Sequence, residues 1–271
     1  FISMNLPELC QLIELQQEIT SEVEKFYNSF DFKTVQEDLQ KLKNMNTEKE
    51  ARVHLNQIFP DDTDQIKMLT CMLICAVDIY QFYLTKGIPK QIYIDTMKCF
   101  TRFISECQNK TGKFAFDRAF WTARQINALL FRIGELEYEM KAINEKQVVS
   151  VHIPSDAIFT DEKCTESLNE AKKFFARFFP TFNDVDYMCR SWLLMPELKT
   201  FLSKDSNIIK FQNRFEIKEV IYEDKEYLEW VFKTRNCEIK DLPEKTTLQR
   251  KLKDHLLKGR KFGSALGYLK K

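Results

Sequence analysis

The chain has 271 residues, of which 44% are hydrophobic and 30% charged; this fits one large or two ordinary globular domains and excludes a disordered chain. Its formal net charge of +1 provides no overall field that would draw the protein to nucleic acid or to an anionic membrane, so we expect neither as a partner. The eight cysteines include no Cys-x-x-Cys pair and no zinc-ligand spacing. We therefore expect free thiols, no metal site and a cytoplasmic location.

The first half of the sequence predicts helices. Residues 1–86 contain no glycine, which favours helices over many tight turns. The longest expected helix runs from about residue 63 to 85, and its apolar run, 68–77, is too short to cross a bilayer. The segment NKTGK at 109–113 is the strongest candidate for a boundary. We therefore predict a helical domain over 1–112 and a second domain over 113–271.

Between residues 132 and 154 the apolar period falls from the helical value to two. The apolar members of the two alternating runs are Leu136, Tyr138, Met140, Val149, Val151 and Ile153. Polar residues occupy the positions between them, including three glutamates in the first run, and Ser150 and His152 in the second. The pattern predicts a β-hairpin with one apolar and one polar face.

Beyond the hairpin the sequence predicts a mixture of helices and strands. A polar loop leads into a helix that Thr165 or Ser167 could cap. Strands are expected at 186–194 and 216–224, and helices at 167–180, 196–202, 207–215 and 242–261. Segment 226–233 fits a helix or a strand, and 263–271 has the pattern of an edge strand. This order of elements indicates the α+β class.

Five segments carry a resemblance to a known fold: FRIGELEYEM (131–140), VHIP (151–154), YMCRSWLL (187–194), SNIIKFQNRF (206–215) and LPEKTTLQRKLKDHLLKG (242–259). Through them the chain from about residue 118 resembles a GNAT-type N-acyltransferase. More narrowly, it resembles a bacterial family of acyltransferase-domain proteins. The resemblance implies a helical N-terminal domain followed by a GNAT-like mixed β-sheet flanked by helices.

The resemblance also implies a site for acetyl-CoA or another acyl-CoA. In GNAT proteins the coenzyme lies between two central strands that splay apart, and its pyrophosphate binds where a loop enters the next helix. By analogy the strands are 147–153 and 186–194, and the loop is 155–166. The coenzyme-binding residues that this implies are Val151, Ile153, Lys163, Thr165, Ser167, Ser191, Trp192 and Asn207.

Two features of the family are missing from this sequence. The loop motif Q/R-x-x-G-x-G/A is absent, because residues 155–166 contain no glycine and only Lys163 as a base. The tyrosine that often serves as general acid is also absent, and Phe211 and Asn213 occupy its region. Phosphate binding is therefore either reworked or lost, and the proton donor is unassigned.

The polar face of the hairpin offers a candidate for acid–base chemistry. A turn at 144–145 would place Glu137 opposite His152. An amine must lose a proton before it attacks a thioester, and an imidazole whose tautomer is fixed by a carboxylate suits that task. We predict Glu137 and His152 as the catalytic pair, while a register slip of two residues would give His152 Glu135 or Glu139 instead. The alternatives are a solvated glutamate face and a histidine bonded to a backbone carbonyl.

Three functions remain open on the sequence. The first is an acyl-CoA-dependent N-acyltransferase that moves an acyl group, expected to be acetyl, to an unidentified small-molecule or peptide amine by direct attack. The second is a non-catalytic GNAT-like binding module that has lost coenzyme binding. The third is a wholly helical interaction protein, which requires the strand predictions to be wrong. The sequence does not specify the oligomeric state.

Overall fold

Two compact units make up the chain in the computed structural model, which describes residues 3–271: one ends at Ile133 and the other is Gly134–Lys271. The predicted boundary at 112/113 differs from this division. Gly112, with φ of 78°, marks the end of a helix inside the first unit, not the end of the unit. The following helix and strand pack on the helices before them and so belong to the first unit.

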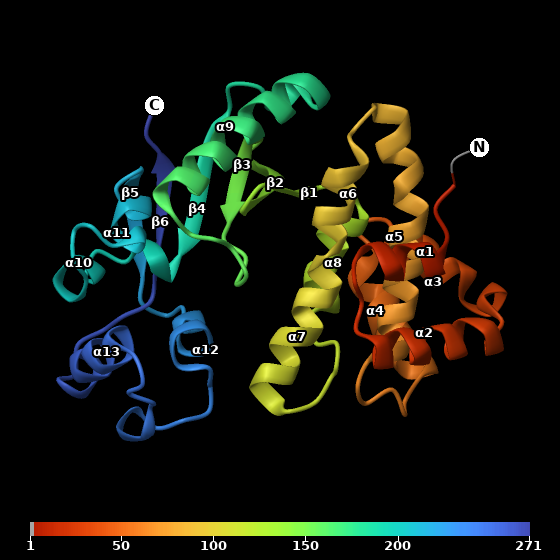
Figure 1. Ribbon diagram of the computed structural model, residues 1–271, viewed down its shortest axis with the longest axis horizontal. Helices are drawn as coiled ribbons and strands as arrows, with labels where there is room; N and C mark the ends of the chain where they lie inside the picture. The colour runs from red at the N-terminus through yellow and green to blue at the C-terminus, as the bar shows by residue number, and fades with distance from the viewer. Residues whose placement is uncertain (1–2) are drawn as a thin grey trace. The chain divides into compact units, whose positions relative to one another are not determined.

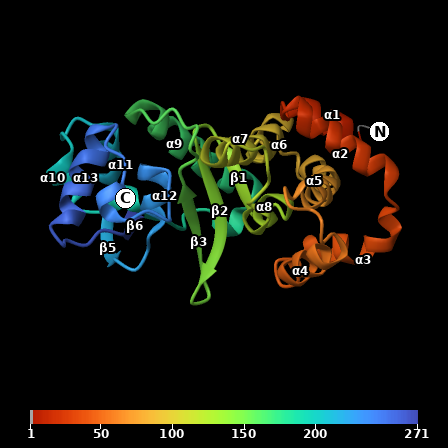
Figure 2. The ribbon, with the colours of Figure 1, turned by 90° about the horizontal axis from the view of Figure 1, so that it is seen from below.

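The first unit is helical, as predicted, and ends in a short strand. Its elements are α1 (Leu6–Leu12), α2 (Gln17–Ser29), η1 (Phe32–Val35), α3 (Gln36–Leu42), α4 (Glu48–Ile58), α5 (Ile66–Lys86), α6 (Lys90–Met97), α7 (Cys99–Thr111), α8 (Ala119–Ile126) and β1 (Leu130–Ile133). Helix α5 is the centre of this unit and contacts α1, α2, α3, α4, α6 and α8 (Figures 1 and 2).

Helix α5 is longer than the apolar run that the sequence suggested. By length and composition its 21 residues could cross a membrane, and 56% of its most apolar stretch is buried inside the protein. It starts at Ile66 because the carboxylate of Asp62 accepts hydrogen bonds from the N–H groups of Lys67 and Met68, at 3.0 Å each. Gly87, with φ of 74°, ends it. These contacts describe the buried core helix of a helical unit.

The second unit contains a mixed sheet flanked by helices. Its strands are β2 (Leu136–Ile143), β3 (Lys146–His152), β4 (Asp186–Ser191), β5 (Phe215–Ile221) and β6 (Ser264–Leu269), in the order β2-β3-β4-β6-β5. Its helices are α9 (Asp161–Phe178), α10 (Leu198–Phe201), α11 (Asn207–Gln212), α12 (Glu226–Phe232) and α13 (Thr247–Leu257), with short 3₁₀ turns η2 (Pro180–Phe182), η3 (Trp192–Leu194) and η4 (Ile239–Asp241). Only β3 and β4 pair in parallel; the other pairs within this unit are antiparallel. This is the predicted α+β architecture.

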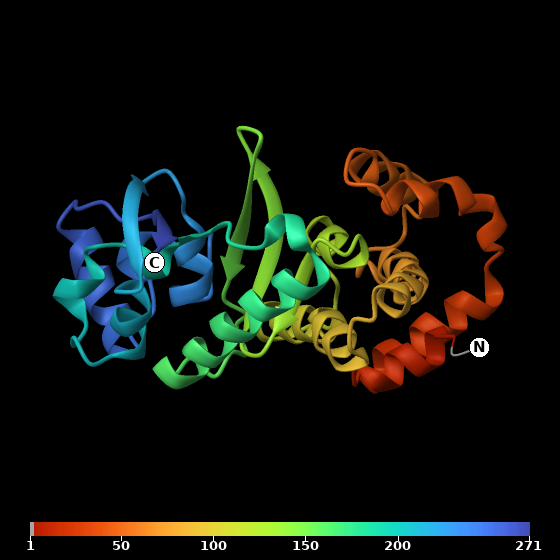
Figure 3. The ribbon, with the colours of Figure 1, turned by 90° about the horizontal axis from the view of Figure 1, so that it is seen from above.

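The predicted hairpin is strands β2 and β3, which Figure 3 shows as a long twisted ribbon. Asn144 and Glu145 form its two-residue turn with φ of 49° and 64°, the left-handed values that a type I′ turn requires. This turn fixes the register, so that Glu137 lies opposite His152 and Glu139 opposite Ser150. The predicted register is confirmed.

Strand β6 corrects one prediction, since it lies between β4 and β5 rather than at an edge. A glycine inside this strand explains the fit. A Cβ atom at Gly267 would come within 3.0 Å of Phe215 Cβ and 3.1 Å of Leu194 Cδ1. The glycine that suggested a loose tail is therefore a point of close packing. The ambiguous segment 226–233 forms helix α12.

The sheet has an apolar and a polar face. On the apolar face, Tyr138 and Tyr187 pack on Phe175 of α9, with ring centroids 6.5 and 6.4 Å apart. The opposite side, here called the polar face, carries Glu137 and Glu139 on β2 and Ser150 and His152 on β3. Because side chains alternate along a strand, Asp186, Met188 and Arg190 of β4 and Tyr268 of β6 lie on the polar face too.

Candidate active site

Strands β3 and β4 separate partway along their length. Their parallel ladder runs from Val148–Asp186 to Ser150–Met188, and no further pair joins them within residues 3–271. Strand β4 continues to pair with β6 as far as Ser191. The two strands therefore open a gap beyond Ser150, here called the splay, at the place where the sequence predicted one.

The splay exposes main-chain groups of β3. A two-residue hairpin turn makes its flanking pair, Ile143 and Lys146, a hydrogen-bonded pair, and such pairs alternate along an antiparallel ladder. His152 then exchanges its hydrogen bonds with β2, whereas the N–H and C=O groups of Val151 point away from β2 and into the splay. Ile153 follows directly after the strand. Val151 and Ile153 are two of the coenzyme-binding residues that the resemblance implied.

His152 and Glu139 form an acid–base pair at the splay. Nε2 of His152 lies 3.0 Å from Oε1 of Glu139, and the side chain of Glu139 is only 8% exposed. The pair is diagonal, because Glu137 is the residue directly opposite His152. Strand twist brings diagonal neighbours within reach of long side chains. The sequence predicted Glu137 and His152 as the pair and named Glu139 only for a slipped register; the structure places Glu139 within hydrogen-bond distance of the imidazole without a slip.

The loop after β3 is shorter than predicted. Helix α9 begins at Asp161, and the hydroxyl of Thr160 accepts a hydrogen bond from Lys163 N–H at 3.2 Å. Lys163 lies in the first turn, and its Nζ bonds Glu166 at 3.1 Å. Because the helix starts before them, Thr165 and Ser167 lie within α9 and do not cap it.

Ser167 belongs to the packing between α9 and the sheet. Its side chain is buried, and its oxygen lies 2.8 Å from the hydroxyl of Tyr138 and 3.3 Å from the N–H of Leu136. The structure therefore places Ser167 beneath the helix rather than on the surface of the loop.

Arg214 is a basic residue that sequence reasoning missed. Its Nη2 donates to Asp161 O at 2.9 Å, to Asp161 Oδ1 at 2.6 Å and to Thr165 Oγ1 at 2.6 Å. It brings a positive charge to the first turn of α9, where Asp161 and Glu162 are acidic. Helix N-termini attract anions, and acidic side chains there oppose a phosphate. Arg214 follows α11, far from α9 in sequence, so only the fold reveals it.

The remaining predicted residues lie near the end of β4 and in α11. Strand β4 ends at Ser191, which accepts a hydrogen bond from Leu193 N–H at 3.1 Å, so the predicted strand 186–194 is too long. Trp192 begins the short turn η3 and is half-buried. Asn207 is the exposed first residue of α11, after Ser206, whose side chain accepts a hydrogen bond from Ile209 N–H at 3.3 Å. Ser191 and Trp192 thus share the splayed end of β4, and Asn207 lies on a separate helix.

Arg190 adds a second cation near the splay, on the polar face. Its Nη2 lies 3.3 Å from Oδ2 of Asp224, which also accepts from Ser264 Oγ at 2.7 Å. Burial alone would raise the pKa of Asp224, but hydrogen bonds from Ser264, Glu226 N–H and Arg190 hold it below its ordinary value. Asp224 is therefore an ionised anchor for Arg190.

The cysteine of β4 and the possible metal ligands of the described residues are the remaining candidates for chemistry. Burial raises the pKa of Cys189 on β4 to about 12, so a thiolate is not available near neutral pH. Within residues 3–271 there is no group of three or more His, Cys, Asp or Glu side chains that could hold a metal ion.

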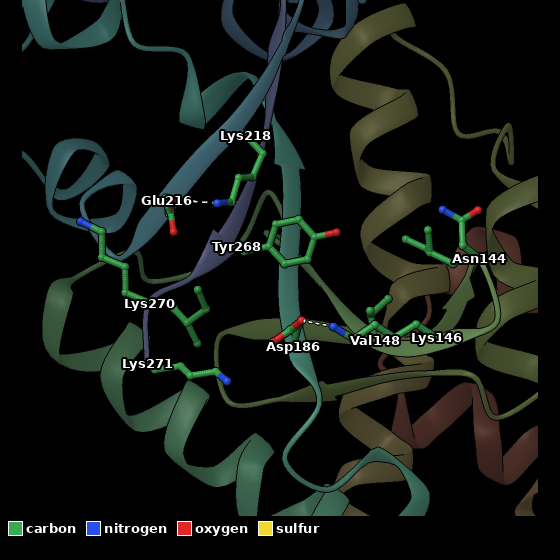
Figure 4. A pocket seen from close by; sticks show the side chains of 11 residues that line it. Asn144, Lys146, Val148, Asp186, Glu216, Lys218, Tyr268, Lys270 and Lys271 are labelled. Atoms are coloured by element: carbon green, nitrogen blue, oxygen red, sulfur yellow. Dashed lines mark hydrogen bonds and ion pairs between the residues drawn. The ribbon is translucent and has the colours of Figure 1, made fainter.

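A cavity of about 720 Å³ lies at the other end of β3 and β4 from the splay (Figure 4). Its walls include Val148 and Tyr268 together with two ion pairs, Lys146–Asp186 at 2.6 Å and Lys218–Glu216 at 2.7 Å. None of the residues predicted for catalysis or coenzyme binding lines it. The candidate acid–base pair, His152 and Glu139, therefore lies away from this cavity, at the splay.

Comparison with protein families finds two matches that together cover most of the chain. Residues 4–128 match the N-acyltransferase N-terminal domain, and residues 130–269 match the GNAT-like C-terminal domain. A comparison with curated proteins gives no match.

Solved structures show the same fold. An acyltransferase in complex with decanoyl-CoA is 21% identical, with a TM-score of 0.78 over 97% of this chain and 86% of that chain. An acyltransferase in complex with decanoyl-CoA and teicoplanin is 19% identical, with a TM-score of 0.79 over 97% and 87%. An acyltransferase mutant with octanoyl-CoA is 19% identical, with a TM-score of 0.80 over 98% and 87%. The chain belongs to the family in which an N-acyltransferase N-terminal domain precedes a GNAT-like C-terminal domain.

Proposed function

We propose that this protein is a cytoplasmic acyl-CoA-dependent N-acyltransferase. The observation that carries the proposal is the splay between β3 and β4, with the His152–Glu139 pair at its edge. The main chain of Val151 would receive the pantetheine arm. The match of residues 4–128 to an N-acyltransferase N-terminal domain supports transfer to nitrogen.

The acyl group we propose is of medium length rather than acetyl. The similar solved acyltransferases hold decanoyl-CoA or octanoyl-CoA, and this supports a longer chain. One of them also holds teicoplanin, which supports an acceptor larger than a simple amine. The acceptor class remains a small-molecule or peptide amine.

The mechanism follows from the polar face. His152, held in one orientation by Glu139, removes a proton from the ammonium or amine nitrogen of the acceptor. The nitrogen attacks the thioester carbonyl carbon, a C–N bond forms, the C–S bond breaks, and coenzyme A leaves as a thiolate. Main-chain N–H groups in the splay stabilise the developing oxyanion.

A ligand series tests the proposal directly. Thermal unfolding is followed with CoA, acetyl-CoA, octanoyl-CoA and decanoyl-CoA at equal concentrations. We expect the medium acyl chains to raise the unfolding temperature most, because at equal concentration the ligand with the lowest Kd stabilises the folded protein most. A ligand at 100 times its Kd stabilises it by about 2.7 kcal/mol. Release of free thiol is then measured with a panel of amines. If no acyl-CoA raises the unfolding temperature, the proposed acyltransferase function is refuted.

One observation favours the second candidate, a binding module without coenzyme. Asp161 and Glu162 place negative charge in the first turn of α9, where a pyrophosphate would bind, and the loop before it lacks glycine. This candidate predicts that none of the four coenzyme forms alters the unfolding temperature.

A further inference from the structure

The cavity of about 720 Å³ belongs to the polar face of the second unit (Figure 4). Asp186 and Tyr268 of its wall lie on this face, where Val148 pairs with Asp186 and Glu216 pairs with Tyr268. Lys146 is two residues from Val148 on β3, so its side chain is on the same face. A cavity of this volume is typical of sites that bind small molecules.

The wall of this cavity has an excess of positive charge. Its charged side chains are those of Lys146, Lys218, Lys270, Lys271, Asp186 and Glu216. Four lysines against two carboxylates give a net side-chain charge of +2, whereas the whole chain has a net charge of +1. A concave wall with charge of one sign raises the local concentration of ligands of the opposite sign. The cavity therefore favours anions.

Two of the lysines are able to bind a ligand at little cost to the fold. Nζ of Lys146 lies 2.6 Å from Oδ2 of Asp186, and Nζ of Lys218 lies 2.7 Å from Oε1 of Glu216. The side chains of Lys146 and Glu216 are 67% and 64% exposed, and ion pairs in contact with water contribute little to stability. Each ammonium group also has three N–H donors, so it can donate to an anion and keep its carboxylate partner.

Tyr268 gives the cavity an aromatic surface between these two ion pairs (Figure 4). Its strand, β6, lies between β4, which carries Asp186, and β5, which carries Glu216. Val148 and Ile143 add apolar surface to the wall. An inorganic anion would use the charges but leave the ring and the apolar surface uncovered. The wall therefore fits an organic ligand that carries more than one negative group.

The phosphates of coenzyme A do not account for this cavity. The pyrophosphate is expected at the first turn of α9, and α9 packs on the apolar face, where its Phe175 contacts Tyr138 and Tyr187. The sheet therefore lies between that helix and the cavity. None of the residues that the resemblance implied for the coenzyme lines the cavity.

We propose that the cavity binds a small organic polyanion, with its negative groups on Lys146 and Lys218 and its carbon skeleton on Tyr268. Phosphate esters and di- or tricarboxylates share this chemistry, because a lysine ammonium group binds either anion as a point charge. The inference goes beyond the proposed acyltransferase function and does not depend on it.

Calorimetric titration of the full chain tests the site, with citrate, fructose bisphosphate and pyrophosphate as probes at one fixed ionic strength. We expect citrate or fructose bisphosphate to bind more tightly than pyrophosphate, which has no carbon skeleton. Tighter binding of citrate would identify a carboxylate ligand, and tighter binding of the bisphosphate a phosphate ester. Lys146→Gln combined with Lys218→Gln should raise the Kd of the tighter probe about 100-fold, which is about 10-fold for each charge-assisted hydrogen bond lost. Thermal unfolding checks that this variant is folded.

The matched control removes two lysines from exposed ion pairs outside the cavity. Lys173 pairs with Glu170 at 2.9 Å on α9, and Lys258 pairs with Asp254 at 2.6 Å at the end of α13. Lys173→Gln combined with Lys258→Gln lowers the net charge by the same amount and should leave the Kd within about two-fold of wild type. An equal loss in this control would show an effect of overall charge and overturn the site. Failure of both organic probes to bind more tightly than pyrophosphate would overturn it as well.

Coenzyme A separates this site from the coenzyme site. With saturating CoA present, we expect the Kd of the tighter organic probe to be unchanged. Competition between the two would place the polyanion in the coenzyme site and overturn the inference. If the protein binds no acyl-CoA, the proposed function fails, and the titrations with citrate and fructose bisphosphate still decide whether the cavity is a binding site.

Discussion

His152 and Glu139 are joined by a 3.0 Å contact that runs diagonally across β2 and β3, past the directly opposite Glu137. Both glutamates are buried, at 3% exposure for Glu137 and 6% for Glu139. The two positions carry the same side chain, and the 3.0 Å contact with the imidazole nitrogen Nε2 is made by Glu139. This asymmetry leads to a test that separates a catalytic pair from a generally acidic face.

Replacing the partner of the imidazole should affect turnover selectively. We expect Glu139→Gln to lower kcat about 10-fold and His152→Gln about 10²-fold or more, with acyl-CoA binding retained in both. Glu137→Gln is the matched comparison and should cost less than Glu139→Gln. Steady-state rates and thermal shifts with the same acyl-CoA check this. A larger loss in Glu137→Gln would return the role to the residue that the sequence predicted.

Arg214 should matter for coenzyme affinity. Its guanidinium is the cation that contacts the first turn of α9, so Arg214→Gln removes the charge that offsets Asp161. We expect the Kd for CoA to rise about 10-fold, the value of one charge-assisted hydrogen bond, with a weaker salt dependence. Lys210→Gln, an exposed change on α11, is the control. Calorimetric titration at two salt concentrations measures both, and an unchanged Kd in Arg214→Gln would place the pyrophosphate elsewhere.

Asp224 predicts a pH-dependent contribution to stability. Its pKa is lowered from 3.8 in the folded protein, so its stabilising effect is complete above that pH and is lost as the pH falls through the lower folded value. Asp224→Asn should reduce the free energy of unfolding by about 1–3 kcal/mol at pH 7. The difference from wild type should shrink below about pH 4. Urea unfolding at pH 7, 5 and 3.5 measures this, with Asp254→Asn on the exposed side of α13 as control.

Gly263 should tolerate no side chain. A Cβ atom there would collide with the carbonyl oxygen of Ile221 and lie 2.8 Å from Tyr222 Cα, both main-chain atoms that cannot rotate away. Gly263→Ala is therefore expected to cost about 1–3 kcal/mol through a shift of β5 against β6. At Gly112 a Cβ atom meets nothing within 4 Å, so Gly112→Ala reports only its backbone strain. Equal free energies of unfolding for the Gly263→Ala protein and wild type would show that β5 can shift to make room for the Cβ atom at no cost.

Sequence patterns predicted the features that depend on neighbouring residues alone. The hairpin follows from alternation at residues 136–153 and from a turn at 144–145, so both its existence and its register could be read from the sequence. The start of α9 could not, because Thr160, Thr165 and Ser167 are all suitable caps and only the path of the chain chooses Thr160. The same limit explains the choice of Glu139, which depends on strand twist rather than on residue order.

Contacts between distant segments were out of reach of sequence patterns. Arg214 reaches α9, and Arg190 reaches Asp224, only because β5 and β6 fold back beside β4. The coenzyme-binding residues implied by the resemblance fall into two groups, those at the splayed strands and those elsewhere. Val151, Ser191 and Trp192 lie on the splayed strands or directly after them, whereas Ser167 is buried beneath α9.

The insertion of β6 between β4 and β5 also constrains the order of folding. Strand β5 pairs with β6, and β4 joins that half of the sheet through β6 alone in the described order. Residues 186–221 therefore cannot close their ladder during synthesis until residues 264–269 have left the ribosome. Such long-range closure is slow and leaves strand edges exposed meanwhile. The newly made second unit should consequently be the part of this protein that depends most on chaperones.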